Sequence, residues 1–489
     1  MIRATILRKL LLPAIEFCTA SRFWTEYCDA ARLDFASESR LQELRKRRLA
    51  ALLNTACATR LHRERLVSAG ISDSETQVAP EQAFDVLNRL APIAKAELRR
   101  NFPDGVTTPL GSADRTYIST SGTTERLTVV ADFNKRDARR SAGFHSLRIA
   151  LNADVGIRCV EIPPNACNVV CGLEDGQPSP SLIEHCWSAF RRGQLFSRES
   201  RAEIHGWVER RLLQHRQTLR PISPCPADSL RSVLDERLTE ATRERPTHLC
   251  ALPQYLLWLA DRMRARGVAI PSLQAVSPYG GLASPRMVDR IESGFGVPFR
   301  NLYGTNELGV IAASCGQSLH ILDDMFVVEI MTEGRPVADG ELGEIVVTDL
   351  HNTAMPLIRY RVGDVGRIMP GPCGCGRHTQ RLEVLGRVQE MLETPLGPLP
   401  AATVADAFFQ DAGVSNLRVE ELAPGRFEAS LVTSPDGPSP DLAACRDRFA
   451  ALHGGVRQLT CRTAAYLQPE TSGKYKLVLP VRRSVESIR

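Results

Sequence analysis

A run of small hydroxyl-bearing residues follows an early extended stretch of the chain. Residues 117–119 are predicted to end a buried strand, and residues 127–130 are predicted to begin another. The loop between them reads Thr120, Ser121, Gly122, Thr123 and Thr124. Such a loop brings backbone N–H groups and hydroxyl donors close together, which suits the charge of a polyphosphate. An ordinary polar hairpin is the alternative, and the spacing is not that of a Walker loop.

Three other segments carry charged groups next to predicted strands or turns. Residues 303–307 combine the ring of Tyr303, which can stack on a planar base, with the carboxylate of Glu307, which can bind Mg²⁺. Residues 357–364 end in Asp364, which can accept hydrogen bonds from ribose hydroxyls. Lys474 follows a Ser-Gly turn. Taken alone, each segment is more typical of a structural turn, and Lys474 of a surface lysine.

Cysteine and histidine supply a second constellation. The set comprises Cys315, His320, Cys373 and Cys375. Three thiolates and an imidazole suit tetrahedral Zn²⁺ and leave no open position, so the metal would be structural. His378 is a less favoured alternative ligand. The competing interpretation is four unrelated reduced side chains, because the two pairs lie far apart in the sequence.

The elements that must position these groups begin with a helical region and an α/β region. Residues 1–100 are predicted to be mostly helical, with a capping box at residues 39–42. Strands then alternate with helices, which favours largely parallel sheets. The predicted strands are 247–253, 273–276 and 297–302, and the predicted helices are 143–155, 201–220, 256–263 and one from Ser284. Ligands gather at the carboxyl ends of such strands, here Pro253, Gly280, Gly281, Tyr303 and Gly304.

The last third of the chain has a different pattern. Short strands are predicted at residues 326–330 and 344–348. After Gly386, strands at 417–422 and 426–432 alternate with helices at 403–411 and 442–452, which makes a small α+β domain. The boundary is placed at residues 386–390. It divides the chain into a large domain of residues 1–386, with residues 1–100 as a helical arm, and a small domain of residues 387–489.

Composition bounds the function. The chain has 489 residues, of which 43% are hydrophobic and 24% charged, with a net charge of +5. This mildly basic balance suits an enzyme of anionic substrates and is far from a nucleic-acid-binding composition. No apolar run is long enough for a membrane span, and Pro13 and Glu16 interrupt the short apolar N-terminus that resembles a signal peptide. The 14 cysteines lack disulfide-framework spacing, which favours a cytoplasmic protein.

The order of the segments resembles the adenylate-forming superfamily along most of the chain after the helical arm. The shared motifs are Thr-Ser-Gly-Thr-Thr at 120–124, Gly-Gly at 280–281, Tyr-Gly-x-x-Glu at 303–307, Arg-Tyr-x-x-Gly-Asp at 359–364 and Ser-Gly-Lys at 472–474. The phenylacetate–CoA ligase-like branch is the closer likeness, through the motifs at 354–361, 373–377 and 385–387. The resemblance implies an α/β fold, with a large multi-subdomain N-terminal adenylate-forming domain and a small mobile α+β C-terminal domain.

The resemblance also implies roles for individual residues. The loop Thr120 to Thr124 would hold the β- and γ-phosphates of ATP. Asp364 would bind the ribose, with Arg387 beside it, and Glu307 would hold Mg²⁺. Lys474 would move in with the small domain to bridge the acid's carboxylate and the α-phosphate. The adenine and acyl pockets would be lined by Gly280, Gly281 and Tyr303, with Gly304 and Thr305 in the same nucleotide site.

Two stretches depart from the family pattern. The phosphate loop normally continues with Gly and often Lys, whereas Glu125 and Arg126 follow Thr124 here. Arg126 can substitute as a phosphate cation, but Glu125 adds a negative charge. The hinge usually carries Asp, whereas this chain has Gln389 and Glu390. The thiol tunnel usually forms near this hinge, so the resemblance implies adenylation more directly than transfer to CoA.

The sequence therefore predicts an ATP-dependent ligase that converts a carboxylic acid into an acyl-AMP and then a thioester, with CoA as the default acceptor. The acid is expected to be an aryl or small acyl acid. One alternative transfers the acyl group to a carrier-protein thiol or an amine. Another is a catalytically weakened nucleotide-binding homologue, although Lys474 argues against it. A homodimer is an expectation that no sequence feature tests.

Overall fold

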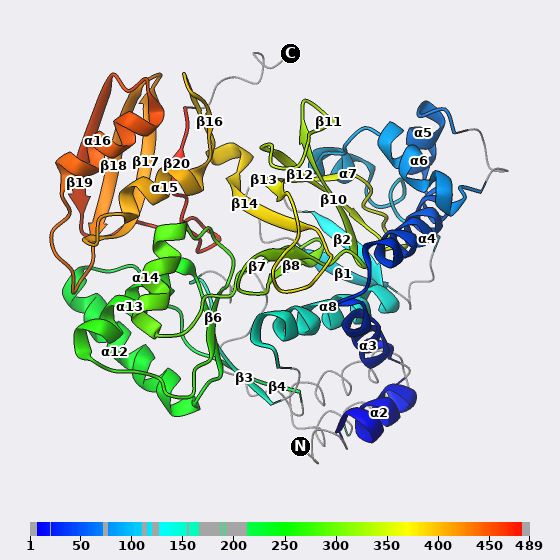
Figure 1. Ribbon diagram of the computed structural model, residues 1–489, viewed down its shortest axis with the longest axis horizontal. Coiled ribbons are helices and arrows are strands. Elements are labelled where there is room, and N and C mark those ends of the chain that lie inside the picture. The colour runs from blue at the N-terminus through cyan, green and yellow to red at the C-terminus, as the bar shows by residue number, and fades with distance from the viewer. Residues whose placement is uncertain are drawn as a thin grey trace.

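A computed structural model describes residues 7–19, 21–71, 77–109, 115–119, 127–153, 156–165 and 213–481, together with Trp187 and Arg191 (Figure 1). The phosphate-loop candidates Thr120, Ser121, Gly122, Thr123 and Thr124, with Glu125 and Arg126, lie outside the described residues. In the described ranges, no helix combines the length and apolarity needed to cross a membrane.

The N-terminal region is helical, as predicted. Its elements are η1 (Leu7–Leu11), α2 (Leu12–Thr19), α3 (Phe23–Leu33), α4 (Glu38–Ala56), α5 (Arg60–Ser68), η2 (Pro80–Gln82), α6 (Ala83–Arg89) and α7 (Lys95–Asn101). The predicted capping box at Ser39 is wrong. Ser37 caps α4 instead, because its hydroxyl accepts the backbone N–H of Arg40 at 3.4 Å. A buried face of α4, α5 and α6 packs on Val327, Leu350 and Ile358 of the large domain.

A two-stranded antiparallel sheet flanks the phosphate-loop candidates. It joins β1 (Arg115–Ser119) to β2 (Thr128–Asp132). The strands fall where they were predicted, although Tyr117 is 62% exposed rather than buried. Helix α8 (Phe133–Leu151) follows at once and begins earlier than predicted. Asp132 caps it by accepting the backbone N–H of Lys135 at 2.6 Å.

A four-stranded parallel sheet forms the α/β part, in the order β4-β3-β5-β6. Its strands are β3 (Ile157–Ile162), β4 (Gln214–Thr218), β5 (His248–Ala251) and β6 (Ala275–Pro278). Helices α12 (Ala227–Glu244), α13 (Pro253–Arg266) and α14 (Pro285–Phe295) share one hydrophobic cluster with it. Strand β4 occupies part of the stretch 201–220 that was predicted to be helical, and residues 201–212 lie outside the described ranges.

A second large sheet is antiparallel, which corrects the prediction of largely parallel sheets. Its order is β11-β10-β12-β13-β14-β9-β8-β7. The strands are β7 (Leu302–Thr305), β8 (Gly309–Ser314), β9 (Leu319–Ile321), β10 (Phe326–Thr332), β11 (Arg335–Pro336), β12 (Gly343–Asp349), β13 (Tyr360–Met369) and β14 (Arg381–Arg387). Within the stretch 297–302, Phe299 makes an isolated bridge to Val276 and Leu302 begins β7, so the predicted strand does not form over its length.

The C-terminal elements form sheets of their own. A hairpin of β15 (Leu392–Thr394) and β16 (Gly397–Leu399) precedes α15 (Ala401–Phe409). The order β19-β18-β17-β20 follows, from β17 (Val414–Ala423), β18 (Arg426–Thr433), β19 (Gln458–Ala464) and β20 (Val478–Leu479), with α16 (Leu442–His453) packed on it. Figure 1 shows these elements beside α13 and α14 on one side and β14 on the other. The division into two domains at 386–390 stays a prediction.

A buried ion pair joins α8 to the end of β12. The Lys135 ammonium lies 2.7 Å from Oδ1 and 2.6 Å from Oδ2 of Asp349, and the two side chains are 1% and 0% exposed. Burial lowers the pKa of Lys135, and the carboxylate of Asp349 opposes that shift. Asp349 also accepts the backbone N–H groups of His351 and Asn352 at 3.0 and 3.3 Å. The pair fixes two segments that flank the nucleotide-site candidates.

We expect Lys135→Met to lower the free energy of unfolding by about 3–5 kcal/mol, because it leaves the Asp349 charge buried and uncompensated. Denaturant unfolding of the purified variant measures this change. Glu43→Ala is the matched control, since it breaks the exposed pair of Arg47 and Glu43 at 2.8 Å. That control should cost only about 0.3–0.5 kcal/mol. Equal losses in the two variants would contradict the role given to the buried pair.

Candidate functional site

Three predicted residues meet at the junction of β7, β13 and β14. The Tyr303 hydroxyl donates to Asp364 Oδ2 at 2.8 Å, and Arg387 Nε lies 3.0 Å from Asp364 Oδ1. Asp364 and Arg387 face each other across the antiparallel pair β13 and β14. Burial raises the pKa of Asp364, although the Arg387 charge and the Tyr303 hydroxyl stabilise the carboxylate. The structure therefore joins the residues expected for the ribose and the adenine into one hydrogen-bonded group.

The predicted metal-binding carboxylate is already paired with a cation. Lys95 Nζ lies 3.0 Å from Oε1 of Glu307, and the Tyr360 hydroxyl donates to the same oxygen at 3.2 Å. Burial raises the pKa of Glu307, but the charge and hydrogen bond of Lys95, together with hydrogen bonds from the backbone and Tyr360, leave that pKa below its ordinary value. A carboxylate oxygen suits Mg²⁺. A metal ion at Glu307 would have to join or replace the ammonium.

Lys95 reaches this position from the helical arm. The backbone of Ile93 bridges strand β13, with its N–H donating to Arg359 O at 2.8 Å and its carbonyl accepting from Arg361 N–H at 2.9 Å. The bridge places Ile93 opposite Tyr360, so Lys95 at the start of α7 lies beside the Tyr360 hydroxyl and Glu307. A second cation approaches through Arg139, which donates to Asn306 O at 2.7 Å.

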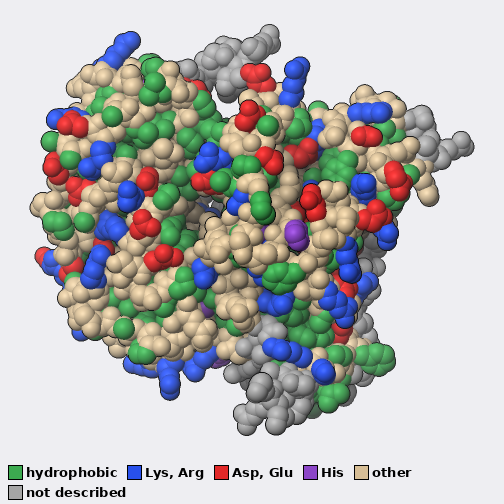
Figure 2. All heavy atoms as spheres, in the orientation of Figure 1, with side chains coloured by type: hydrophobic (Ala, Val, Ile, Leu, Met, Phe, Trp, Pro, Cys, Tyr) green, Lys and Arg blue, Asp and Glu red, His purple; other side chains and the backbone are tan. Residues whose placement is uncertain are grey.

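Lys474 comes from the C-terminal elements to the Gly280 loop. Its Nζ lies 2.9 Å from the point that a Cβ on Gly280 would occupy, and Gly280 has a φ of +69°. A side chain at this position would be strained by the positive φ and would displace the end of the Lys474 side chain. Gly281 packs in the same way against Pro253, whose Cδ is 3.1 Å from the corresponding point. Figure 2 shows the surface hollowed where the C-terminal elements meet the rest of the chain.

The remaining predicted nucleotide-site residues lie close by in the sequence and fold. Gly304 and Thr305 end β7, and the Thr305 hydroxyl accepts the Leu308 backbone N–H at 3.2 Å. The side chain of Thr305 therefore closes the turn that carries Glu307. The structure brings together Gly280, Lys474, Asp364, Arg387, Tyr303 and Glu307 around the end of the antiparallel sheet, and their binding roles stay predictions.

The four predicted metal ligands converge. The ligand atoms of Cys315, His320, Cys373 and Cys375 all lie within 4.8 Å of one another. Cys315 Sγ is 3.7 Å from Cys373 Sγ, and Cys375 Sγ is 3.3 Å from His320 Nε2. Zn–S bonds of about 2.3 Å in a tetrahedron place two sulfurs about 3.8 Å apart, so the donor set fits this geometry. His378 is not part of the cluster.

Neighbouring side chains orient this cluster. The His320 Nδ1 lies 2.9 Å from the Thr379 hydroxyl, which directs Nε2 toward Cys375. Arg377, two residues after Cys375, places its guanidinium 4.8 Å from the Phe35 ring centre and 3.6 Å from Asp34. The cluster thereby links the turns of the antiparallel sheet to the end of α3.

The predicted hinge contains a buried carboxyl group. Glu390 ends the short helix η4 (Val388–Glu390) and is 9% exposed. Burial raises the pKa of Glu390 to about 7, while the charges of Arg387 and Lys476 oppose the shift and Glu470 adds to it. The preceding Gly386 has a φ of +136° and packs on Ala401 of α15. The hinge is thus held by packing on both sides.

Several groups at this site were missed from the sequence. They are Lys95, Arg139 and the hydroxyl of Tyr360, together with the supporting pair of Lys135 and Asp349. One sequence signal was available. The chain has six lysines among its 61 basic residues. Three of the six are Lys95, Lys135 and Lys474. Lysine is a compact point charge that arginine does not replace, so its scarcity marks these positions.

The parallel sheet carries a polar face behind the Gly280 loop. His248 Nε2 lies 2.8 Å from the Ser277 hydroxyl, and Nδ1 lies 3.5 Å from Cys159 Sγ. Glu161 pairs with Arg216 at 3.4 Å on the neighbouring strands. Burial lowers the pKa of His248 to about 4, so the ring is neutral near pH 7. These contacts fix strands β5 and β6, which lead to Pro253 and Gly280.

Comparison with solved structures identifies the fold. A 2-hydroxyisobutyryl-CoA ligase in the postadenylation state, bound to 2-HIB-AMP, superposes with a TM-score of 0.66, covers 92% of each chain and is 18% identical. The fold is that of the adenylate-forming enzymes. The same ligase in the thioesterification state gives a TM-score of 0.52 at 17% identity and covers 92% of this chain and 91% of that one.

Comparison of sequences finds phenylacetate-coenzyme A ligases among the relatives of this chain. The phenylacetate-coenzyme A ligase of Thermus thermophilus is 32% identical over 160 residues, or 30% of this chain and 36% of that protein. The ligase of the same name from Escherichia coli K12 is also 32% identical over 160 residues. The match spans about a third of the length of these curated relatives. The resemblance to the phenylacetate–CoA ligase-like branch is thus confirmed; no protein-family model matches the chain.

Glu390 leads to a pH prediction. Its folded pKa of about 7 exceeds the ordinary value of 4.5, so between these pH values the folded protein retains a proton that the unfolded chain has lost. Stability should therefore fall as pH rises through this window, and the loss is complete above about pH 7. Glu390→Gln removes the cost of ionisation. Its melting temperature should exceed the wild-type value at pH 8 and converge with it near pH 4.5.

The exposed Glu393 on β15 supplies a control for this experiment. Glu393→Gln should leave the wild-type pH dependence unchanged. Parallel melting curves for wild type and Glu390→Gln from pH 4.5 to 8 would contradict a raised Glu390 pKa.

Proposed function

We propose that the protein is an AMP-forming acid–thiol ligase. The observation that carries the proposal is the position of Lys474, whose ammonium reaches Gly280 beside the group of Tyr303, Asp364 and Arg387. The adenylate-forming fold and the partial relationship to phenylacetate-coenzyme A ligases support it. An aryl or small acyl acid is the substrate class, and CoA is the default acceptor.

In the first step, a carboxylate oxygen of the acid attacks the α-phosphorus of ATP. A P–O bond forms, the bond to the bridging oxygen breaks, and pyrophosphate leaves with its electron pair. Lys474 would offset the repulsion between carboxylate and phosphate, since a positioned cation stabilises charge that develops in the transition state. Asp364 and Arg387 would hold the ribose. Glu307, with Lys95 beside it, would hold Mg²⁺, which supplies further charge neutralisation when bound.

In the second step, the sulfur of the thiol attacks the acyl carbon. The C–S bond forms, the C–O bond to AMP breaks, and AMP leaves while the thiol proton passes to solvent. The runner-up acceptors are a carrier-protein thiol and an amine. The acceptor that AMP release requires, whether CoA, a carrier protein or an amine, discriminates among them. Cytoplasmic location and a homodimer stay predictions.

The activity itself is tested by acid-dependent exchange of labelled pyrophosphate into ATP over a panel of aryl and small acyl acids. Lys474→Ala should lower this exchange about 10²–10³-fold, because it removes one charge-stabilising group. ATP binding and melting temperature should be unchanged. Lys476→Ala is the matched control, since Lys476 pairs with Glu470 at 2.6 Å instead of facing Gly280. Wild-type exchange by Lys474→Ala would refute the assigned mechanism.

We also propose a structural zinc ion bound by Cys315, His320, Cys373 and Cys375. The donor set and the closeness of the ligand atoms support it. Protein purified without chelator should contain about one zinc per chain. Cys375→Ser should lose the metal and melt at a lower temperature, because binding free energy is also folding free energy. Cys461→Ser on β19 is the control and should keep the metal. Full zinc content in Cys375→Ser would exclude this site.

A further inference from the structure

We propose that Tyr475 is a positioning residue that docks on helix α13 and thereby sets Lys474 at the Gly280 loop for acyl-AMP formation. The inference rests on the proposed function, which assigns the chemistry of Lys474. It adds a residue outside the motifs of the family resemblance. Four observations carry it: the aromatic contacts of Tyr475, the turn that joins it to Lys474, the contacts between α13 and the C-terminal sheet, and the unpartnered hydroxyl.

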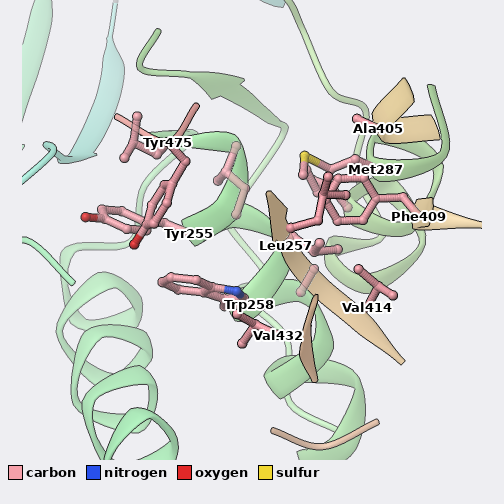
Figure 3. Close-up of a cluster of buried hydrophobic side chains, with 14 of the residues drawn as sticks. Tyr255, Leu257, Trp258, Met287, Ala405, Phe409, Val414, Val432 and Tyr475 are labelled. Carbon is pink, nitrogen blue, oxygen red and sulfur yellow. The ribbon is translucent and has the colours of Figure 1, made fainter. Parts of the chain in front are cut away.

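Tyr475 packs into an aromatic cluster on α13. Its ring makes an edge contact with Trp258, with ring centres 6.1 Å apart at 77°. Trp258 in turn packs on Tyr255 at 5.5 Å. Figure 3 shows Tyr475 lying beside Tyr255 and Trp258, at one end of a cluster that also holds Leu257 and Met287. The exposed fraction of Tyr475 is 8% and that of Tyr255 is 0%. The ring is therefore a buried anchor.

A tight turn makes Lys474 and Tyr475 one unit. The Glu470 backbone N–H donates to Lys474 O at 2.8 Å, and the Gly473 N–H donates to Glu470 O at 2.8 Å. Residues 474–477 are in neither a helix nor a strand, and the two neighbouring side chains contact different parts of the chain. This places the Lys474 ammonium against Gly280 and the Tyr475 ring against α13. Fixing the ring therefore fixes the ammonium.

The helix that receives Tyr475 is itself tied to the C-terminal sheet. Trp258 Nε1 donates to the Ser415 carbonyl at 3.2 Å, and the Ser434 hydroxyl donates to Asp261 at 2.9 Å. The same helix begins at Pro253, which contacts Gly281. Helix α13 thus touches the loop that Lys474 must reach and the sheet from which Lys474 extends.

The anchor depends on the ring and not on its hydroxyl. The Tyr475 hydroxyl is buried and has no hydrogen-bond partner in the described part of the chain. Removing a buried polar group that lacks a partner is neutral or favourable, whereas removing the ring opens a cavity. Tyr475→Phe should therefore keep the docking contact, and Tyr475→Ala should lose it. Comparison of these two variants distinguishes an effect of the Tyr475 ring from an effect of its hydroxyl.

The two half-reactions provide the functional test. Tyr475→Ala should lower kcat for acid-dependent pyrophosphate exchange about 10²-fold, because displacing a group by about 1 Å costs that much, while KM for ATP stays near the wild-type value. Thioester formation from supplied acyl-AMP should be unchanged. Tyr475→Phe should restore exchange. Tyr466→Ala, at a Tyr that is 40% exposed on the same domain, is the control and should be silent.

The outcomes decide between positioning and a general structural role. Equal losses in both half-reactions with a lower melting temperature would overturn the inference, as would wild-type exchange in Tyr475→Ala. Failure of the wild-type protein to exchange pyrophosphate with any acid in the panel would instead contradict the proposed function.

Limited proteolysis tests the docking of Tyr475 even if the wild-type protein does not exchange pyrophosphate. Trypsin cleavage after Lys476 can be followed by mass spectrometry, because the bond precedes Leu477, which is 1% exposed. Cleavage at this bond should be faster in Tyr475→Ala than in wild type, Tyr475→Phe and Tyr466→Ala. Equal rates in all four proteins would show that Tyr475 does not hold the segment, whatever reaction the protein catalyses.

Discussion

The buried contact between Lys135 and Asp349 constrains the arrangement of the large domain. A charged pair removed from water must be fully compensated, or its desolvation cost exceeds its attraction. Asp349 Oδ1 accepts two backbone N–H groups besides the Lys135 ammonium, and Asn352 Nδ2 donates to Val130 O at 3.1 Å. Strand β2, helix α8 and the end of β12 are thus held in one register. The residues expected to bind nucleotide lie at the edges of this group.

Lys135, Lys95 and Lys474 have different electrostatic surroundings. Lys135 is buried against Asp349 and supports the fold. Lys95 pairs with Glu307, and its charge opposes the rise in the Glu307 pKa that burial causes. Lys474 arrives from the C-terminal elements. Lys95 and Lys135 pair with Glu307 and Asp349, whereas the charge of Lys474 acts, with that of Arg387, on Asp364.

Much of the fold could be predicted where local signals agree with tertiary packing. The pattern around α13 and the Ser-Pro start of α14 both predicted the observed helices, because apolar spacing and capping act within a few residues. The antiparallel sheet could not be predicted in full, since the pairing of β14 with β9 depends on contacts between residues such as Arg381 and His320 that are distant in sequence. The same limit applies to Lys95, whose partner Glu307 lies 212 residues away.

The sequence predicted several residues of the candidate site, but not which of them contact one another. Short motifs marked Tyr303, Asp364 and Arg387, yet only the fold shows that they share hydrogen bonds. The metal ligands were found because three thiols and an imidazole form a donor set with few alternatives. Tyr475 carried no signal, since a lone aromatic beside a lysine is common. Its position depends on a surface of α13 that no local pattern describes.

Under the proposed function, the C-terminal elements would place Lys474 for the first step and withdraw it for the second, which would require an interface of limited stability. Apolar burial favours docking, because one hydrophobic cluster includes α13, α14 and C-terminal residues such as Phe409 and Val414. One buried polar group opposes it, because the hydroxyl of Tyr475 has no hydrogen-bond partner in the ranges that the structure describes.

An unsatisfied buried group costs about 1–3 kcal/mol, and undocking would return the Tyr475 hydroxyl to water. Hydration of this hydroxyl would offset part of the free-energy cost of exposing apolar surface. The aromatic residue proposed to place the Lys474 ammonium therefore also carries a group that lowers the cost of removing it. Under the proposed function, this balance would suit a reaction in which the ammonium serves the first step and makes room for a thiol in the second.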